Sequence, residues 1–201
     1  MLSFDFSENY VLENERARLI PLKISHVGAL VSISKEDNLW TYMLDKPIGR
    51  EKLIQYVLSA MSQRHLNKEY SFVIFDKIQN AYAGMTRLYE YSEELKNIKL
   101  GHTWYGEKFR NTGLNKHCKY LLFQFIFDKL QLERIGFGIH SENKISLMAL
   151  KSVGCKKEGV LRNFLPSIDG SKRTDIVLMS IIAKEWKTDA KRMLQQKLNI
   201  N

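Results

Sequence analysis

The sequence is poor in residues that interrupt a chain or cross-link it. Its 201 residues include three prolines and two cysteines, with no repeat, low-complexity tract or Ser/Gly-rich linker to mark a domain boundary. Cys118 and Cys155 do not form a C-x-x-C pair, which argues against a zinc or redox motif. We therefore expect one domain over residues 1–201, free thiols and no metal.

Long apolar runs and the common nucleotide motifs are also missing. No stretch near either end approaches the roughly 18 apolar residues of a spanning helix, and the first ten residues lack the basic-then-apolar order of a signal peptide. The expectation is a cytoplasmic protein without a membrane partner. Neither G-x-x-x-x-G-K-[ST] nor G-x-G-x-x-G occurs, which argues against ATP-type and dinucleotide-type binding.

What the chain does have is positive charge, with a formal net charge of +9. A basic surface attracts phosphate groups over a screening length of about 8–10 Å at physiological salt. The Lys and Arg residues are spread along the chain and do not gather in the runs typical of nucleic-acid-binding arms. The charge fits a phosphorylated small ligand and does not favour a nucleic acid partner.

Strand and helix patterns alternate through most of the chain, from about residue 16 to residue 186. The predicted strands are Ala17–Leu22, Tyr70–Asp76, Tyr82–Tyr91, Lys99–Tyr105, Arg134–His140, Lys156–Phe164 and Asp175–Ile182. The predicted helices are His26–Ile33, Arg50–His65, Gly113–Leu130, Asn143–Val153 and a C-terminal helix at about 184–198. Thr112 is the expected N-cap of the long helix, and Gly154 is the expected end of the helix Asn143–Val153.

The most informative segment joins the strand Lys99–Tyr105 to the helix Gly113–Leu130. A helix start exposes unpaired N–H groups with about half a positive charge, and a glycine there lets a phosphate approach the main chain. Arg110, just upstream, adds a forked cationic donor. A diphosphate would fit between Arg110 and the amides of Gly113–Lys116, although many capped helices near an arginine share this pattern.

The residues of this segment resemble a known family. Arg110-Asn111-Thr112-Gly113-Leu114-Asn115 is similar to the R-x-x-G-x-[G/A] signature of the GNAT superfamily of N-acetyltransferases, with Asn115 in place of the last small residue. Four segments resemble the RimJ/RimL branch, the ribosomal-protein-alanine acetyltransferase type. They are Phe109–Lys116, Ser141–Ser146, Gly154 with Glu158–Arg162, and Glu185–Trp186.

The resemblance implies an α/β (α+β) GNAT fold. Its mixed, strongly bent sheet of about seven strands would carry helices on both faces, with Lys99–Tyr105 and Arg134–His140 splaying apart around acetyl-CoA. The core would span about residues 16–186. The residues implied to contact the cofactor are Thr103, Trp104, Tyr105, Phe109, Arg110, Asn111, Thr112, Gly113, Leu114, Asn115, Lys116, Asn143 and Ser146. Without the family, Asn143 is simply a helix N-cap and Ser146 a surface serine.

The implied activity is transfer of acetyl from acetyl-CoA to a primary amine, such as a protein N-terminal α-amine, by direct attack in a ternary complex. Such attack needs a base for the ammonium and an acid for the departing thiolate. Many relatives place a tyrosine acid on the helix Asn143–Val153, which contains none. Ser146, His102 and Tyr105 are the candidates that remain, although an isolated strand histidine is more often a packing residue.

Several alternatives stay open from the sequence. The same fold can serve as a non-catalytic CoA-binding protein or as a ribosome- or RNA-associated protein. The acceptor can be a ribosomal protein or a small amine such as a polyamine, an amino sugar or an antibiotic. We expect Asp37–Arg50 and Tyr89–Asn97 to shape its site, and both a monomer and a homodimer fit.

Overall fold

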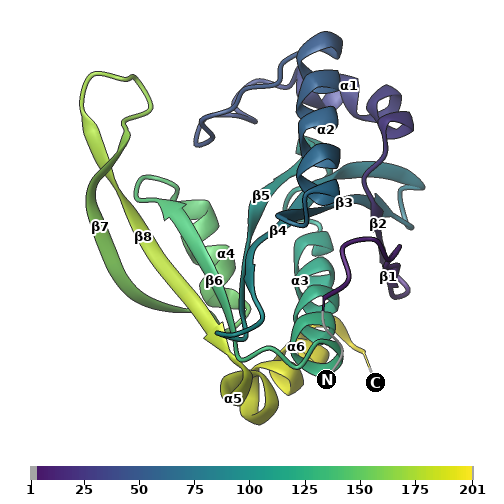
Figure 1. The fold of residues 1–201 in the computed structure, drawn as a ribbon, viewed down its shortest axis with the longest axis vertical. Coiled ribbons are helices and arrows are strands. Elements are labelled where there is room, and N and C mark those ends of the chain that lie inside the picture. The colour runs from purple at the N-terminus through teal and green to yellow at the C-terminus, as the bar shows by residue number, and fades with distance from the viewer. Residues whose placement is uncertain (1–3, 201) are drawn as a thin grey trace.

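The computed structural model describes residues 4–200, and within them it contains one eight-stranded sheet in the order β1-β2-β3-β4-β5-β6-β8-β7 (Figure 1). The strands are β1 (Leu12–Glu13), β2 (Ala17–Pro21), β3 (Glu69–Asp76), β4 (Ala81–Ser92), β5 (Asn97–Tyr105), β6 (Arg134–His140), β7 (Lys156–Pro166) and β8 (Arg173–Ile182). Neighbouring strands run antiparallel except β5 and β6, which are parallel. The mixed sheet is confirmed, and β1 is the strand that the sequence did not predict.

Helices cover both faces of this sheet. The helices are α1 (Val27–Ser34), α2 (Arg50–His65), α3 (Leu114–Gln124), α4 (Lys144–Ser152), α5 (Ala183–Glu185) and α6 (Lys191–Leu198), with π turns at Phe125–Lys129 and Trp186–Ala190 and 3-10 turns at Ile24–His26 and Glu107–Phe109. Helix α2 packs against β3 and α1 against β4, whereas α3 packs against β1, β2 and α6 (Figure 1). None of the described helices is long and apolar enough to cross a membrane.

The long helix predicted as Gly113–Leu130 is α3 followed directly by a π turn. Its apolar residues recur at i, i+3 and i+4 and all face the core, which the helical period requires of a packed helix. Phe123 of α3 and Phe127 of the π turn contact the fully buried Trp186 in one aromatic cluster. The buried apolar residues of α3 and the π turn include Leu114, Cys118, Leu121, Leu122, Phe123, Phe125, Ile126 and Phe127.

Strands β5 and β6 pair only where they begin. Their register joins Asn97 to Arg134, Ile98 to Ile135 and Lys99 to Gly136, and no further pair is formed between these two strands. Beyond that point β5 stays with β4 up to Tyr105, and β6 stays with β8 up to His140. The two parallel strands therefore diverge, as Figure 1 shows, and the predicted splay is confirmed.

A β-bulge interrupts the β4–β5 ladder beside this divergence. Met85 pairs with Trp104 and Arg87 with Gly101, so Thr86 alone faces both His102 and Thr103. His102 takes a left-handed φ of 48°. A bulge redirects side chains and leaves main-chain groups outside the ladder. Strand β5 is thus irregular in the part that no longer pairs with β6.

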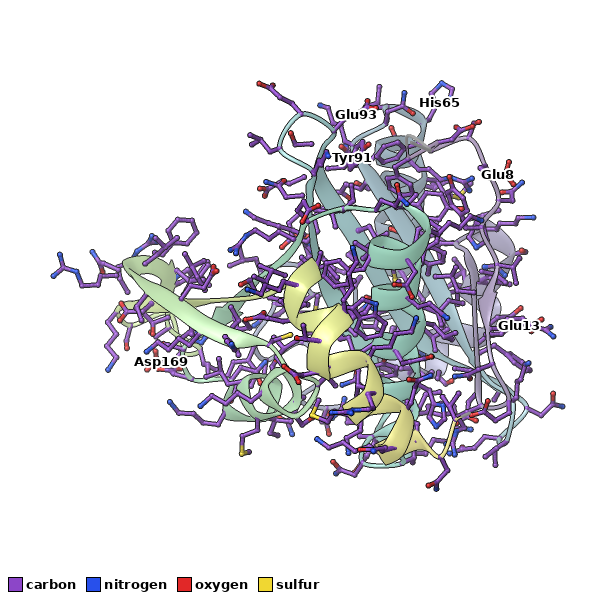
Figure 2. All side chains as sticks on the ribbon, turned by 90° about the horizontal axis from the view of Figure 1, so that it is seen from below. Glu8, Glu13, His65, Tyr91, Glu93 and Asp169 are labelled. Atoms are coloured by element: carbon purple, nitrogen blue, oxygen red, sulfur yellow. The ribbon has the colours of Figure 1, made fainter. Side chains whose placement is uncertain are left out.

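The far end of the sheet is a long β7–β8 hairpin that stands away from the rest of the chain (Figure 1). Most of β7 is exposed, because it is the edge strand. In Figure 2 Asp169, between β7 and β8, and Glu13, on β1, lie on opposite sides of the molecule. They mark the two ends of the sheet.

Candidate functional site

The loop between β5 and α3 has the conformation that an anion site needs. Asn111 and Gly113 both take left-handed φ values, 59° and 88°. Gly113 is the N-cap of α3, so the prediction of Thr112 was wrong by one residue. The Thr112 hydroxyl instead donates to the Phe109 carbonyl at 2.8 Å. A Cβ added at Gly113 would meet no heavy atom of residues 4–200 within 4 Å, so the space beside this glycine is open.

The main-chain amides of this loop have few partners. Within residues 4–200 the amides of Asn111, Thr112, Gly113 and Asn115 donate to no protein acceptor, and that of Leu114 only reaches the Thr112 hydroxyl at 3.4 Å. Unpaired amides at the start of a helix of this length bind anions, with the helix dipole adding to the attraction. The loop therefore fits the diphosphate of a coenzyme A thioester.

Arg110 lies next to these amides in sequence, and contacts with Tyr105 and Glu36 hold its side chain in place. Its Nε donates to the Tyr105 carbonyl at 2.9 Å, and its Nη2 lies 4.0 Å from Oε2 of Glu36. Glu36 also accepts a hydrogen bond of 2.7 Å from the amide of Glu107. The guanidinium is exposed, so its charge is available to an anion, although Glu36 offsets part of it.

Tyr105 ends β5 and turns its hydroxyl toward α3. It donates to Oδ1 of Asn115 at 3.2 Å. Burial raises the pKa of Tyr105 well above 10, and the nearby Cys118 thiol raises it further. The Tyr105 hydroxyl therefore stays protonated, and its proton is engaged in the hydrogen bond to Asn115.

Thr103 and Trp104 use their side chains within the fold. The Thr103 hydroxyl lies 2.7 Å from that of Thr86. The Trp104 indole is buried against Trp40, with ring centroids 5.1 Å apart. Their main-chain groups, next to the bulge, are therefore the parts of these residues that a ligand in the divergence can reach.

On the opposite side of the divergence, Asn143 caps α4. Its Oδ1 accepts a hydrogen bond of 3.0 Å from the amide of Ser146, and its own amide donates to the His140 carbonyl at 2.9 Å. The side chain of Ser146 is half-buried. The predicted cofactor residues thus fall into two groups, one on β5, the loop and α3, the other at the end of β6 and the start of α4.

His102 lies on the α2 side of the sheet, near Arg87, whose guanidinium contacts the ring of Tyr56 on α2. Its ring meets that of Tyr89 edge-on, with centroids 5.4 Å apart. Burial, and then the charge of Arg87, lowers the pKa of His102 below its usual 6.5, while Glu69 acts in the other direction. The imidazole is therefore mostly neutral near pH 7 and able to accept a proton.

Several residues around His102 escaped the sequence analysis. Arg87 on β4 forms an ion pair of 2.6 Å with Glu69 on β3, and its guanidinium lies under the ring of Tyr56 on α2. The Tyr89 ring beside His102 also lies against Gly101, where a Cβ would be 3.1 Å from it, so a glycine within this strand is the local sign of close packing here. The remaining contacts join elements distant in sequence.

Two adjacent side chains on α3, His117 and Cys118, are not part of this site. Cys118 is a buried free thiol whose pKa burial raises to about 12, so it is a packing residue. His117 is half-buried; its Nδ1 lies 3.1 Å from Nδ2 of Asn14 and 3.3 Å from Oε1 of Glu15. Adjacent helix positions point in different directions, and the two residues accordingly face different neighbours.

The splayed sheet and the amide-lined loop define an acyltransferase of the GNAT type. The family model described as an acetyltransferase (GNAT) domain matches residues 16–156, well over half of the chain. The protein therefore belongs to the GNAT acetyltransferase family, whose members use acetyl-CoA.

Solved structures are similar over nearly the whole chain. A candidate acetyltransferase from T. thermophilus is 26% identical, with 98% of this chain and 100% of that chain covered and a TM-score of 0.83. The GCN5-related N-acetyltransferase from Brucella melitensis is 23% identical, with 94% and 85% covered and a TM-score of 0.85. Mycobacterium smegmatis RimJ in complex with CoA-disulfide is 19% identical, with 94% and 93% covered and a TM-score of 0.78. At such identities the last two show a shared fold. A search of curated proteins gave no match.

Proposed function

We propose that the protein transfers the acetyl group of acetyl-CoA to a primary amine, such as a protein N-terminal α-amine, by direct attack in a ternary complex. The observation that supports this most is the row of amides from Asn111 to Asn115 beside Arg110, of which, within residues 4–200, only that of Leu114 has a partner. They face open space at Gly113, at the end of the strand that diverges from β6. We further propose that the chain works in the cytoplasm as one domain with its core at residues 16–186.

Acetyl-CoA, when bound, supplies the thioester that the amine attacks. The loop amides and Arg110 would hold its diphosphate, with Asn143 and Ser146 on the opposite side of the divergence. Main-chain groups at the β5 bulge would polarise the acyl carbonyl, as donors in an oxyanion hole do. His102 is mostly neutral near pH 7 and lies on the α2 side of the sheet beside the β5 bulge, so it is the candidate to take a proton from the amine.

One observation favours a second candidate, a CoA-binding protein without turnover. The thiolate needs a proton donor, yet the Tyr105 hydroxyl is directed at Asn115 on α3. Ser146 is then the candidate acid that remains, and serine is a weak acid. This role therefore carries the least support among the proposed ones.

Calorimetry and thiol release together test the proposal. Gly113→Glu should abolish CoA binding, because a carboxylate would enter the open space where the diphosphate sits. Gly170→Glu is the matched control, because Gly170 also has a positive φ of 72° with nothing within 4 Å, but lies in the β7–β8 turn. Arg110→Ala should weaken CoA binding roughly 10-fold.

The wild-type protein should release free thiol from acetyl-CoA when a suitable amine is present. Tight CoA binding without thiol release on any amine would favour the second candidate. CoA binding that survives Gly113→Glu would exclude the loop as the diphosphate site.

A further inference from the structure

Buried polar atoms without partners gather on the α2 side of the sheet. Within residues 4–200 five buried side-chain nitrogen or oxygen atoms make no hydrogen bond. Four of them are Tyr56 Oη, Ser71 Oγ, Arg87 Nε and Trp104 Nε1; Tyr56 and Trp104 lie close enough for the indole to oppose the rise that burial causes in the pKa of Tyr56, but they form no well-aligned hydrogen bond. Native proteins pair almost all such atoms, so a group of four at one place asks for a ligand or another explicit cause.

Contacts between three strands and a helix bring these four side chains together. Ser71 on β3 is the register partner of Arg87 on β4. The Arg87 guanidinium carbon lies 5.2 Å from the ring centroid of Tyr56 on α2. Trp104 on β5 pairs with Met85, two residues before Arg87 on the same face. Each of the four residues is at least nine-tenths buried.

This polar cluster lies next to the reacting centre of the proposed transfer. Trp104 directly follows the bulge of His102 and Thr103. Trp40 covers the cluster, with its ring 5.1 Å from that of Trp104 and 6.4 Å from that of Tyr56. It belongs to the segment between α1 and α2, expected from the sequence to shape the acceptor site. Helix α3 packs on the opposite face of the sheet, so we expect an acceptor to approach from the cluster's side.

The chemistry of the cluster selects what it can bind. Trp104 Nε1 and Arg87 Nε can only donate hydrogen bonds, whereas the two hydroxyls can donate or accept. The charge of Arg87 is already neutralised by Glu69 at 2.6 Å. A carboxylate would therefore bring an uncompensated charge into a buried place, and an alkyl polyamine would bring no acceptor oxygen.

We propose that the polar cluster recognises a neutral acceptor oxygen, an amide carbonyl or a hydroxyl, carried by the amine that is acetylated. The inference rests on the proposed function. It favours peptide N-termini, whose first carbonyl lies two bonds from the amine nitrogen, and hydroxylated amines such as amino sugars. It disfavours free amino acids and polyamines.

Thiol release from acetyl-CoA with matched amines tests this. Alaninamide carries the neutral carbonyl, alanine replaces it by a carboxylate, and sec-butylamine lacks the oxygen; glucosamine and spermidine separate hydroxylated amines from polyamines. Tyr56→Phe and Ser71→Ala should lower kcat/KM for the preferred oxygenated amine roughly 5- to 10-fold while changing that for sec-butylamine less than about twofold. Tyr82→Phe, a hydroxyl deletion at the other end of β4, should change neither.

Equal losses on oxygenated and oxygen-free amines, or no loss on either, would overturn the inference while leaving the transferase proposal intact. The absence of acetylation on every amine would overturn the transferase proposal instead. In that event, the inference about the polar cluster is tested by calorimetry, in which alaninamide and glucosamine are titrated into the CoA-loaded protein. Binding of either that Tyr56→Phe weakens keeps the inference, and no binding of either overturns it.

Discussion

The Tyr105 hydroxyl donates a hydrogen bond of 3.2 Å to Oδ1 of Asn115, joining the last residue of β5 to the first turn of α3. Asn115 stands where the GNAT signature has a small residue. Its side chain is engaged within the fold, while its amide finds no acceptor among the residues that the structure describes. The departure from the signature thus adds a contact between strand and helix and leaves the amide row in place.

Asn115→Ala should therefore affect folding more than ligand binding. We expect the free energy of unfolding to fall by about 1 kcal/mol, because one buried hydrogen bond is lost, and CoA affinity to change less than about threefold. Urea unfolding and calorimetry measure the two effects. Tyr105→Phe should act in the same direction, and the double variant should lose little more than either single one. A large loss of CoA affinity in Asn115→Ala would show that its side chain binds the cofactor.

Gly84→Ala should damage the strand pair that carries the site. A Cβ at Gly84 would lie 1.9 Å from the Trp104 carbonyl oxygen, a main-chain atom that cannot turn aside, and the φ of 154° disfavours other residues. We expect a loss of roughly 2–4 kcal/mol in the free energy of unfolding. Gly159→Ala is the control, because nothing lies within 4 Å of its Cβ position. Thermal unfolding of both variants tests this, and equal stability would contradict the clash.

Elements with strong local signals could be predicted from the sequence. The helix Arg50–His65 and the strand Arg134–His140 have the predicted bounds, because apolar periodicity marks both, and Pro47 and Gly49 precede the helix. The start of α3 was misplaced because the left-handed φ of Gly113 delays the first helical residue to Leu114. A two-residue strand such as β1 is too short to show a period.

Within the site, too, the parts with local sequence signals could be predicted and the parts formed by distant segments could not. The diphosphate loop is a contiguous segment, so its residues could be named from the sequence. The splay came only from the family resemblance, because it depends on the register between β5 and β6, which are distant in sequence. The polar cluster was missed altogether, because Tyr56, Ser71, Arg87 and Trp104 become neighbours only once α2 packs over three strands.

Protonation of His102 should make the reaction rate fall at acidic pH, which is the acid limb of the pH–rate profile. Burial and Arg87 hold the pKa of His102 below 6.5, so kcat/KM should fall only below pH 6.5, and His102→Gln should remove that limb along with much of the activity. The folded protein favours the neutral imidazole of His102. This residue should therefore lower the free energy of unfolding as the pH drops from 6.5 toward the lower pKa of His102 in the folded state. A pH–rate profile and urea unfolding between pH 5 and 8 measure both. An unchanged acid limb in His102→Gln would reduce this histidine to a packing role.

Lys119 on α3 should be a source of instability at neutral pH. It is buried, forms no ion pair within residues 4–200, and its Nζ lies 5.5 Å from the ring centroid of Phe137. Burial lowers the pKa of Lys119 from 10.5 to about 8. Below pH 8 the ammonium is charged in both states and the full cost of burying it applies, and this cost disappears as pH rises from 8 to 10.5.

Lys119→Met should then raise the free energy of unfolding by roughly 1–3 kcal/mol at pH 7, because an apolar side chain of similar length replaces a buried charge. The gain should shrink between pH 8 and pH 10, since the wild type itself becomes more stable there. Lys187→Met, at an exposed position in the turn before α6, should show neither effect. Urea unfolding of the three proteins at pH 7 and pH 9.5 measures this. A gain that stays constant with pH would mean that packing, and not the relief of a buried charge, stabilises the variant.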